Sequence, residues 1–378
     1  MKRTSFLIAV IVTVILTAGL CYAQDASTYY NQGSDYLKNG QYEQALASFK
    51  EAVRLAPDSS GGFFGLGASY YFLSRYTEAI DAFKEAIRLE PGFSGAYWMM
   101  GDSYFELKRY QEAVDALKEA IRFKPDLTEA YFKLGKSYVL LYRYQEGMDA
   151  LRETLRLDPN YTEAYAALGS AYLLTTSYQE AIENFKAYLR LKPDDSQIHY
   201  FLGNAYYYLK QYQEAMNSFK EALRLKPNYA EANYMVGETY FELKNFGEAV
   251  NFLNEAIRND PNYPEANFEL GRAFLNLDRY EEAISAYKEA IRLKPDYASA
   301  YFGTGIAYIS LGKNKEAIEP LKEALRLKPD FKEAHFSLGL AYVATGDKAS
   351  ASKEYETLKN LDKKLAESLY KAINKDNQ

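Results

Sequence analysis

Few residues in this sequence have side chains suited to acid–base, nucleophilic or metal chemistry. The two histidines, His199 and His335, take a position that Tyr131 and Tyr165 fill elsewhere in the chain, which favours packing over metal binding or proton transfer. No Gly-rich phosphate loop, His-Glu-x-x-His pattern or supported Ser/His/Asp set is present. We therefore expect no catalytic residue, no metal site and no cofactor.

The residue types that recur are suited to binding: aromatic rings at a fixed spacing of 34 residues. The sequence has 37 Tyr and 21 Phe against one Trp, which indicates a few aromatic positions used repeatedly. Rings offer flat apolar faces on which peptide side chains or sugars stack. One column, aromatic at nine of ten positions, is Tyr30, Phe64, Trp98, Phe132, Ala166, Tyr200, Tyr234, Phe268, Phe302 and Phe336.

The same period of 34 residues defines the elements that must position these rings. The segment EAIRLKP at residues 289–295 has a counterpart in almost every unit. Prolines follow the period from Pro57 to Pro329, and glycines follow it from Gly33 to Gly339. Such a period indicates one array of stacked units, although length alone would suggest roughly two or three domains.

Each unit contains two apolar stripes at helical spacing, separated by a polar turn such as LGK at 311–313, which predicts two short antiparallel helices. A mid-helix glycine costs about 0.5–1 kcal/mol of stability relative to alanine, so a whole column of glycines needs a packing reason. It predicts that the paired helix approaches closely, opposite a column of alanines. Proline ends the second helix, and we expect the residue behind it, such as Asp296 or Asn228, to cap the next helix. Arginines such as Arg292 are expected on a solvated face, where they complement the helix dipole.

Together these features resemble the tetratricopeptide repeat (TPR) family. The residues that carry the resemblance are Tyr131, Leu134, Gly135 and Tyr138, followed in the next unit by Ala181, Phe185 and Pro193. The match covers roughly residues 26–362, in ten units that start near residues 26, 60, 94, 128, 162, 196, 230, 264, 298 and 332. The resemblance implies an all-α fold, a right-handed superhelical α-solenoid of antiparallel helix pairs. Residues 363–375 are predicted to form an amphipathic capping helix.

The resemblance also implies where a partner would bind, because the first helices of a TPR array line a concave groove. The expected contact residues are Tyr30, Phe64, Trp98, Phe132, Lys133, Lys136, Tyr200, Tyr234, Glu238, Phe268, Arg272, Phe302 and Phe336. Those that break the repeat pattern, and that we expect to set specificity, are Trp98, Lys133, Lys136, Ala166, Glu238 and Arg272.

Charged residues near the expected groove are mostly acidic. The acidic ones are Glu129, Glu163, Glu231, Glu265, Glu333, Asp102, Glu106, Glu238, Glu242 and Glu269, and the basic ones are Lys38, Lys133, Lys136 and Arg272. The Lys and Asn pair with which some chaperone-binding TPRs clamp a C-terminal carboxylate is not reproduced at Phe132 and Lys136 or at Tyr200 and Asn204. We therefore expect an aromatic, basic or neutral partner segment.

The first residues have the pattern of a secretory signal peptide. A basic start precedes an apolar run from Phe6 to Leu20 and a small-residue site ending at Ala23, so residues 1–23 would be removed and the protein exported to the periplasm or the cell exterior. One alternative is an uncleaved membrane anchor formed by residues 5–22. Another is attachment of a lipid at Cys21.

The net charge of −6 argues against a nucleic-acid partner, which needs clustered Lys and Arg. Residues 363–378 are too few for a catalytic domain, so we expect no enzyme. The favoured interpretation is an exported TPR scaffold that binds protein or peptide segments in an aromatic-lined groove and supports assembly of an envelope or secreted complex. Two alternatives stay open: a membrane-anchored assembly or secretion component, and binding of glycans or cell wall through the same rings.

Overall fold

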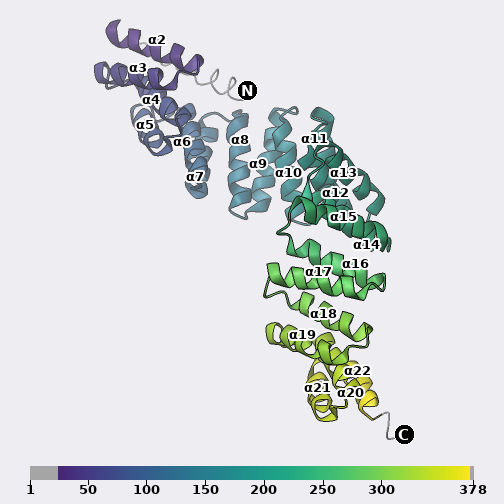
Figure 1. Cartoon of the computed structure of the whole chain (residues 1–378). Coiled ribbons are helices and arrows are strands. Elements are labelled where there is room, and N and C mark those ends of the chain that lie inside the picture. The colour runs from purple at the N-terminus through teal and green to yellow at the C-terminus, as the bar shows by residue number, and fades with distance from the viewer. Residues whose placement is uncertain (1–23, 375–378) are drawn as a thin grey trace. The chain divides into compact units, whose positions relative to one another are not determined.

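The structure, a computed structural model, describes residues 24–374. The predicted signal peptide or anchor, residues 1–23, lies outside the described residues. Between residues 24 and 374 the chain is built of helices, α2 to α22, without strands (Figure 1). The helices fall into two compact units, which meet in sequence between Pro193 and Asp194, and each unit is described by itself.

Unit 1, residues 24–193, consists of five helix pairs. Its first helices are α2 (Gln24–Lys38), α4 (Ser60–Phe72), α6 (Ser94–Glu106), α8 (Thr128–Leu140) and α10 (Thr162–Leu174). Its second helices are α3 (Tyr42–Leu55), α5 (Tyr76–Leu89), α7 (Tyr110–Phe123), α9 (Tyr144–Leu157) and α11 (Tyr178–Leu191). Each of α3, α5, α7 and α9 packs against its own first helix and against the first helix of the next pair.

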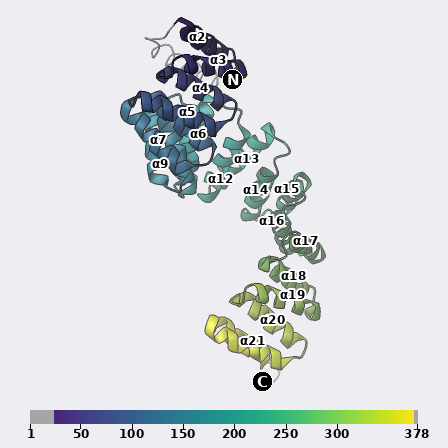
Figure 2. The same cartoon turned by 90° about the vertical axis from the view of Figure 1, so that its left-hand side faces the viewer.

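Unit 2, residues 194–374, repeats this arrangement from α12 to α21 (Figure 2) and adds one helix, α22, which Figure 1 labels. Its first helices are α12 (Ser196–Tyr208), α14 (Ala230–Glu242), α16 (Pro264–Asn276), α18 (Ala298–Ser310) and α20 (Lys332–Ala344). Its second helices are α13 (Tyr212–Leu225), α15 (Phe246–Asn259), α17 (Tyr280–Leu293), α19 (Asn314–Leu327) and α21 (Lys348–Leu361). The last helix, α22 (Lys363–Ile373), packs against α20 and α21 and buries Ala366, Leu369 and Ile373.

The stacked helix pairs confirm the all-α solenoid predicted from the sequence. Within a pair, the glycine column makes room for a large side chain of the second helix. A Cβ atom added to Gly203 would lie 2.5 Å from the Phe219 ring, and one added to Gly101 would lie 2.7 Å from Cγ of Leu117. The nearest neighbour of these glycines is therefore a large apolar side chain. Where the alanine column is among the nearest atoms, it is there through a backbone oxygen, such as Ala113 O at 3.3 Å from the atom added to Gly101.

The prediction that Asp296 and Asn228 cap the following helices is wrong. The N-cap residues of α14 and α18 are Tyr229 and Tyr297, and neither makes a side-chain capping hydrogen bond. The ring centroid of Tyr297 lies 4.9 Å from that of Phe268. This helix start is therefore stabilised by ring packing. At α12, by contrast, the N-cap residue Asp195 accepts hydrogen bonds from two backbone N–H groups of the first turn.

The arginine column lies on the exposed face of the second helices, as expected. Arg292 forms an ion pair with Glu289 at 2.6 Å, and its side chain is 64% exposed. An exposed pair three residues apart on a helix stabilises it by only about 0.2–0.5 kcal/mol. These arginines are thus part of a solvated surface.

Candidate interaction faces of the two units

We use the term first-helix face for the surface that α2, α4, α6, α8 and α10 form in unit 1, and for the surface that α12, α14, α16, α18 and α20 form in unit 2. Consecutive first helices contact one another within each unit, as α6 contacts α8 and α14 contacts α16. These two faces correspond to the groove expected from the sequence.

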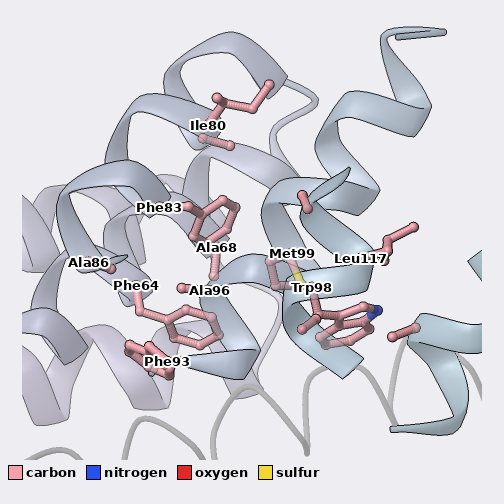
Figure 3. Packing of buried hydrophobic residues seen from close by; sticks show 14 of the residues in the cluster. Phe64, Ala68, Ile80, Phe83, Ala86, Phe93, Ala96, Trp98, Met99 and Leu117 are labelled. Atoms are coloured by element: carbon pink, nitrogen blue, oxygen red, sulfur yellow. The ribbon is translucent and has the colours of Figure 1, made fainter. Parts of the chain in front are cut away.

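The aromatic column packs the first helices of successive pairs together. Most of its rings lie against the aromatic N-cap residue of the next first helix, and Figure 3 shows Phe64 beside Phe93. The ring centroids of these pairs are 4.9 Å apart for Phe64 and Phe93, 4.9 Å for Phe132 and Tyr161, 5.2 Å for Tyr200 and Tyr229, 5.1 Å for Tyr234 and Tyr263, 4.9 Å for Phe268 and Tyr297, and 4.7 Å for Phe302 and Phe331.

The two units differ in how much of this column stays accessible. In unit 1 the rings of Tyr30, Phe64, Trp98 and Phe132 are all buried, with 4% or less of each residue exposed. In unit 2 the column residues Tyr200, Tyr234, Phe268, Phe302 and Phe336 are half-buried. Partner contact stays a prediction for these residues, and a partner would reach the unit 1 rings only if the helix packing opened.

Trp98 lies among the fully buried side chains, close to Met99 (Figure 3). Its indole Nε1 atom is buried and has no hydrogen-bond partner. A buried donor without an acceptor costs roughly 1–3 kcal/mol, which the large apolar surface of the ring offsets. Trp98 is therefore first of all a residue of the core of unit 1.

A charged cluster lies at the centre of the first-helix face of unit 1. Its members, called here the α6/α8 cluster, are Tyr71, Asp102, Phe105, Glu106, Lys133 and Lys136. The Nζ atom of Lys133 pairs with the buried carboxylate of Asp102 and lies 3.2 Å from Oε1 of Glu106. The same ammonium group lies 4.5 Å from the centre of the Phe105 ring, a cation–π contact.

The protonation states in this cluster follow from its contacts. Burial alone would lower the pKa of Lys133, but the carboxylates of Asp102 and Glu106 raise it above its usual value. The Tyr71 hydroxyl donates a hydrogen bond to Oδ2 of Asp102 at 2.9 Å. Burial and the adjacent Asp102 carboxylate raise the pKa of Tyr71 far above its usual value, so this hydroxyl keeps its proton. The cluster is an internally neutralised set of two cations and two carboxylates.

A second cluster occupies the corresponding place in unit 2. Its members, called here the α14/α16 cluster, are Tyr207, Glu238, Phe241, Glu242, Glu269 and Arg272. Arg272 forms an ion pair with Glu269 at 2.6 Å and lies 4.3 Å from the centre of the Phe241 ring. Glu269 is 7% exposed, and its side chain is hydrogen-bonded to that of Glu238. The other oxygen of Glu238, Oε1, is buried without a partner.

The α14/α16 cluster therefore contains more carboxylates than cations. Burial, and then the negative charge of Glu269, raises the pKa of Glu238 to about 8. Burial also raises the pKa of Glu269. Two hydrogen-bonded carboxyl groups that are both removed from water share a proton. At neutral pH the pair thus carries one negative charge, which Arg272 faces.

The structure brings some of the sequence-predicted contact residues together and leaves others apart. Lys133 and Lys136 join one cluster, and Glu238 and Arg272 join the other. Both lysines lie over the ring of Phe105, which was not among the predicted contact residues. Tyr71, Tyr207 and Phe241 were missed in the same way. One sequence signal could have found these residues. Each is an aromatic residue in the last turn of a first helix, and the next first helix along the chain carries a charge that breaks the repeat pattern.

His199 and His335 lie in their helices at the position that Tyr165 fills in α10. His335 is buried, and its two ring nitrogens lie 2.6 Å from a carboxylate oxygen of Glu354 and 2.9 Å from the carbonyl oxygen of Pro329. Between residues 24 and 374 the structure contains no group of three or more His, Cys, Asp or Glu residues arranged to hold a metal ion. None of the helices in that range is both long enough and apolar enough to cross a membrane.

Comparison with known protein families agrees with this architecture. Models described as tetratricopeptide repeats match residues 30–92, 101–141 and 129–161. A model described as the C-terminal domain of cilia and flagella-associated protein 70 matches residues 160–369, more than half of the chain. No curated protein sequence matches the chain.

Solved structures similar to this chain include one described as a TPR repeat-containing protein. The C-terminal part of a TPR repeat-containing protein from Cytophaga hutchinsonii is 21% identical, with a TM-score of 0.53, and the match covers 63% of this chain and 97% of that one. A crystal structure of MamA is 30% identical over 44% of this chain and 97% of its own, with a TM-score of 0.42. PilF of Pseudomonas aeruginosa is 20% identical over 53% of this chain and 92% of its own, with a TM-score of 0.47.

The likeness to the Cytophaga hutchinsonii protein shows the fold alone, whereas the family matches cover both units. The chain therefore belongs to the tetratricopeptide repeat family, and its residues 160–369 belong to the helical-repeat family described as the C-terminal domain of cilia and flagella-associated protein 70.

Proposed function

We propose that this chain is a non-enzymatic, exported scaffold whose two first-helix faces bind segments of partner proteins and so support assembly of an envelope or secreted complex. The TPR fold is a protein-interaction repeat. The exported location, the use of the two first-helix faces and the role in complex assembly are what we propose. The observation that carries it is the charged cluster at the centre of each face.

Packing does not require either cluster. Taking a charged group out of water costs several kcal/mol, and apolar residues of similar volume pack as well or better at such sites. Other first helices show this, because α4 and α18 carry no charged residue at all. Side chains such as Asp102 and Glu269 are therefore better explained by a role in recognition than by a role in folding.

The exported location rests on the N-terminal sequence pattern of residues 1–23. An intact mass of the protein from its native host that equals residues 24–378 would support cleavage. A mass that includes residues 1–23 would instead favour a membrane-anchored assembly or secretion component. The first-helix faces would serve either role.

Binding of glycans is less favoured. Sugars stack on exposed ring faces, and in unit 2 each of Tyr234, Phe268 and Phe302 already packs against another ring. Less of each ring is therefore left for a sugar than the sequence suggests. Protein segments can use the ring edges together with the charged clusters.

The test is crosslinked co-purification from the native host with two matched variants. One carries Glu106→Lys and Glu242→Lys, exposed positions on first helices, and the other carries Asp115→Lys and Glu281→Lys, exposed positions on second helices. Both change the net charge equally. We expect the first variant to lose partners that the wild-type chain and the second variant retain. Loss of the same partners from the second variant alone would contradict the proposal.

A further inference from the structure

We propose that the first-helix face of unit 2 is a docking surface for a basic protein segment, and that the α14/α16 cluster receives a lysine or arginine side chain of that segment. This inference rests on the proposed function, because it names the chemistry of a partner for one of the two faces.

The two clusters are built from corresponding positions of their first helices. Asp102 and Glu238 are both the ninth residue of their helices α6 and α14, and Lys133 and Glu269 are both the sixth residue of α8 and α16. In unit 1 the ammonium group of Lys133 pairs with Asp102 and Glu106. In unit 2 the corresponding residue, Glu269, is an acid, so this position does not supply a cation.

Arg272 fills only part of this role. Its guanidinium group lies over Phe241, much as the lysines lie over Phe105, and its ion pair is made with Glu269. The carboxylate of Glu238 is hydrogen-bonded to Glu269 and has no ion pair of its own among the described residues. The cluster thus lacks one positive charge relative to unit 1.

Two buried hydrogen-bond acceptors on α12 and α14 have no donor. Oε1 of Glu238 is buried and without a partner, and so is Oδ1 of Asn204. Asn204 is the ninth residue of α12, so the two residues hold the same place in neighbouring first helices. A buried acceptor without a donor costs roughly 1–3 kcal/mol. An ammonium or guanidinium group brings several donors at once, which is the chemistry that these oxygens lack. Both atoms are buried, so a ligand cation enters beside the exposed Glu242 and reaches Glu238 when its half-buried side chain turns toward it.

The face around the cluster also carries more acidic than basic residues. Besides the cluster, α14 and α16 carry Glu231 and Glu265, of which Glu265 forms an ion pair with Lys294 at 3.6 Å. Arg272 is the only basic residue on the two helices themselves. The neighbouring first helices α12 and α18 carry no Asp, Glu, Lys or Arg. The electrostatic potential of this face is therefore negative, which attracts a basic segment and repels an acidic one.

Cation binding on this face is linked to a proton. The groups that face Glu238 are Glu242 on its own helix, Glu269 and Arg272 on α16, Tyr207 on α12, and the hydroxyls of Tyr234 and Tyr297. The carboxyl pair of Glu238 and Glu269 holds an exchangeable proton near neutral pH, because the pKa of Glu238 is raised to about 8. A bound cation displaces that proton. Affinity should therefore rise with pH up to about 8 and level off above it.

The test selects ligands for the full chain from a random-sequence peptide library. We expect the peptides recovered with the wild-type chain to be enriched in Lys or Arg. In the variant Glu269→Lys, the introduced lysine takes the place that Lys133 has in unit 1, and this enrichment should disappear. The matched control is Glu281→Lys, which makes the same charge change on the exposed surface of α17 and should keep it.

One enriched peptide is then compared with its counterpart in which each Lys or Arg is replaced by Gln. We expect the basic peptide to bind at least about tenfold more tightly, because it pairs with a carboxylate that is otherwise left without a cation. Its advantage should grow as the pH rises toward 8. Circular dichroism is used to check that the Glu269→Lys chain is folded.

The outcomes separate this inference from the function on which it rests. Enrichment of neutral or acidic peptides by the wild-type chain, or equal enrichment of basic peptides by the Glu269→Lys chain, overturns the inference and leaves peptide binding intact. Recovery of no peptide overturns the inference too. In that case the co-purification experiment decides whether the first-helix faces bind proteins at all.

Discussion

Lys133 and Glu269 hold the same place in two different units and have opposite charges. Lys133, on α8, forms an ion pair with Asp102 of the preceding first helix. Glu269, on α16, is hydrogen-bonded to Glu238, which corresponds to Asp102. One repeat geometry thus produces a neutralised cluster in unit 1 and an acidic cluster in unit 2. Two faces of the same fold can therefore recognise different partner segments.

Replacing Glu238 with Gln should change how stability depends on pH. The pKa of Glu238 is raised to about 8 from an unfolded value of 4.5, so its protonated form stabilises the folded state, and this stability is lost as the pH rises between these two values. Gln keeps the neutral shape. Relative to wild type, the Glu238→Gln chain should gain about 1 kcal/mol for each pH unit in this window. Urea unfolding across the window measures the difference.

The control for that measurement is Glu281→Gln, at an exposed position of α17. Its free energy of unfolding should depend on pH in the same way as that of the wild-type chain. Equal profiles for Glu238→Gln and wild type would mean that Glu238 is ionised in the folded chain at neutral pH, which contradicts the shared proton.

The glycine column offers a prediction about packing. An added Cβ atom on Gly203 would lie 2.5 Å from the Phe219 ring, so Gly203→Ala should destabilise unit 2 by about 1–3 kcal/mol through overpacking. Gly247, in α15, has no atom within 4 Å of an added Cβ. Gly247→Ala should therefore leave stability unchanged or raise it by up to about 0.5–1 kcal/mol. Thermal unfolding of the two variants compares them, and similar losses in both would argue against a packing role for Gly203.

Trp98 should matter for folding before it matters for binding. It is 2% exposed, so Trp98→Ala should destabilise unit 1 by about 3–5 kcal/mol. Trp98→Phe keeps most of the ring and removes the unpartnered Nε1 donor, and its cost should be much smaller. Urea unfolding checks both variants. A Trp98→Ala chain as stable as wild type would show that the ring is not part of the core.

The C-terminal helix pairs of unit 2 should lose stability as the pH rises above the usual pKa of histidine. The hydrogen bond with Glu354, together with the carbonyl of Pro329, raises the pKa of His335, although its burial acts in the other direction. The stabilisation is thus fully present below pH 6.5 and is lost as the pH rises through the higher folded pKa. The variant His335→Tyr should remove this dependence, because the corresponding Tyr165 hydroxyl donates to Pro159 O at 3.1 Å without a titrating ring.

Nuclear magnetic resonance titration of the His335 ring gives the independent check. A ring that titrates below the usual histidine value would contradict the assignment, since it would mean that burial outweighs the Glu354 carboxylate.

Much of the fold could be predicted because it repeats. The spacing of 34 residues and the Pro and Gly columns are local signals, and they were enough to predict helix pairs and their order. The capping residues were predicted wrongly because Tyr297 takes the N-cap of α18 and packs on Phe268, a contact between residues 29 positions apart. The start of α18 is therefore set by tertiary ring packing and not by the local capping preference of Asp296.

The candidate sites could be predicted only in part, for a related reason. Charges that break the pattern, such as Lys133 and Glu238, stood out in the sequence. Their partners did not, because Asp102 and Lys133 come from different helix pairs and meet only when α6 packs against α8. The burial of Phe64 and Phe132 was missed likewise, since it depends on the aromatic residue that begins the next first helix.

The most direct test of the account places a photo-crosslinking amino acid at single exposed positions and maps the crosslinked proteins by mass spectrometry in the native host. Tyr208 and Ser310 report on the first-helix face of unit 2, and Asn217 and Glu281 report on its second helices. We predict a specific partner crosslinked from Tyr208 and Ser310, through a segment that contains Lys or Arg, and from neither Asn217 nor Glu281. A partner crosslinked only from Asn217 or Glu281 would contradict it, because binding would then take place on the opposite helices.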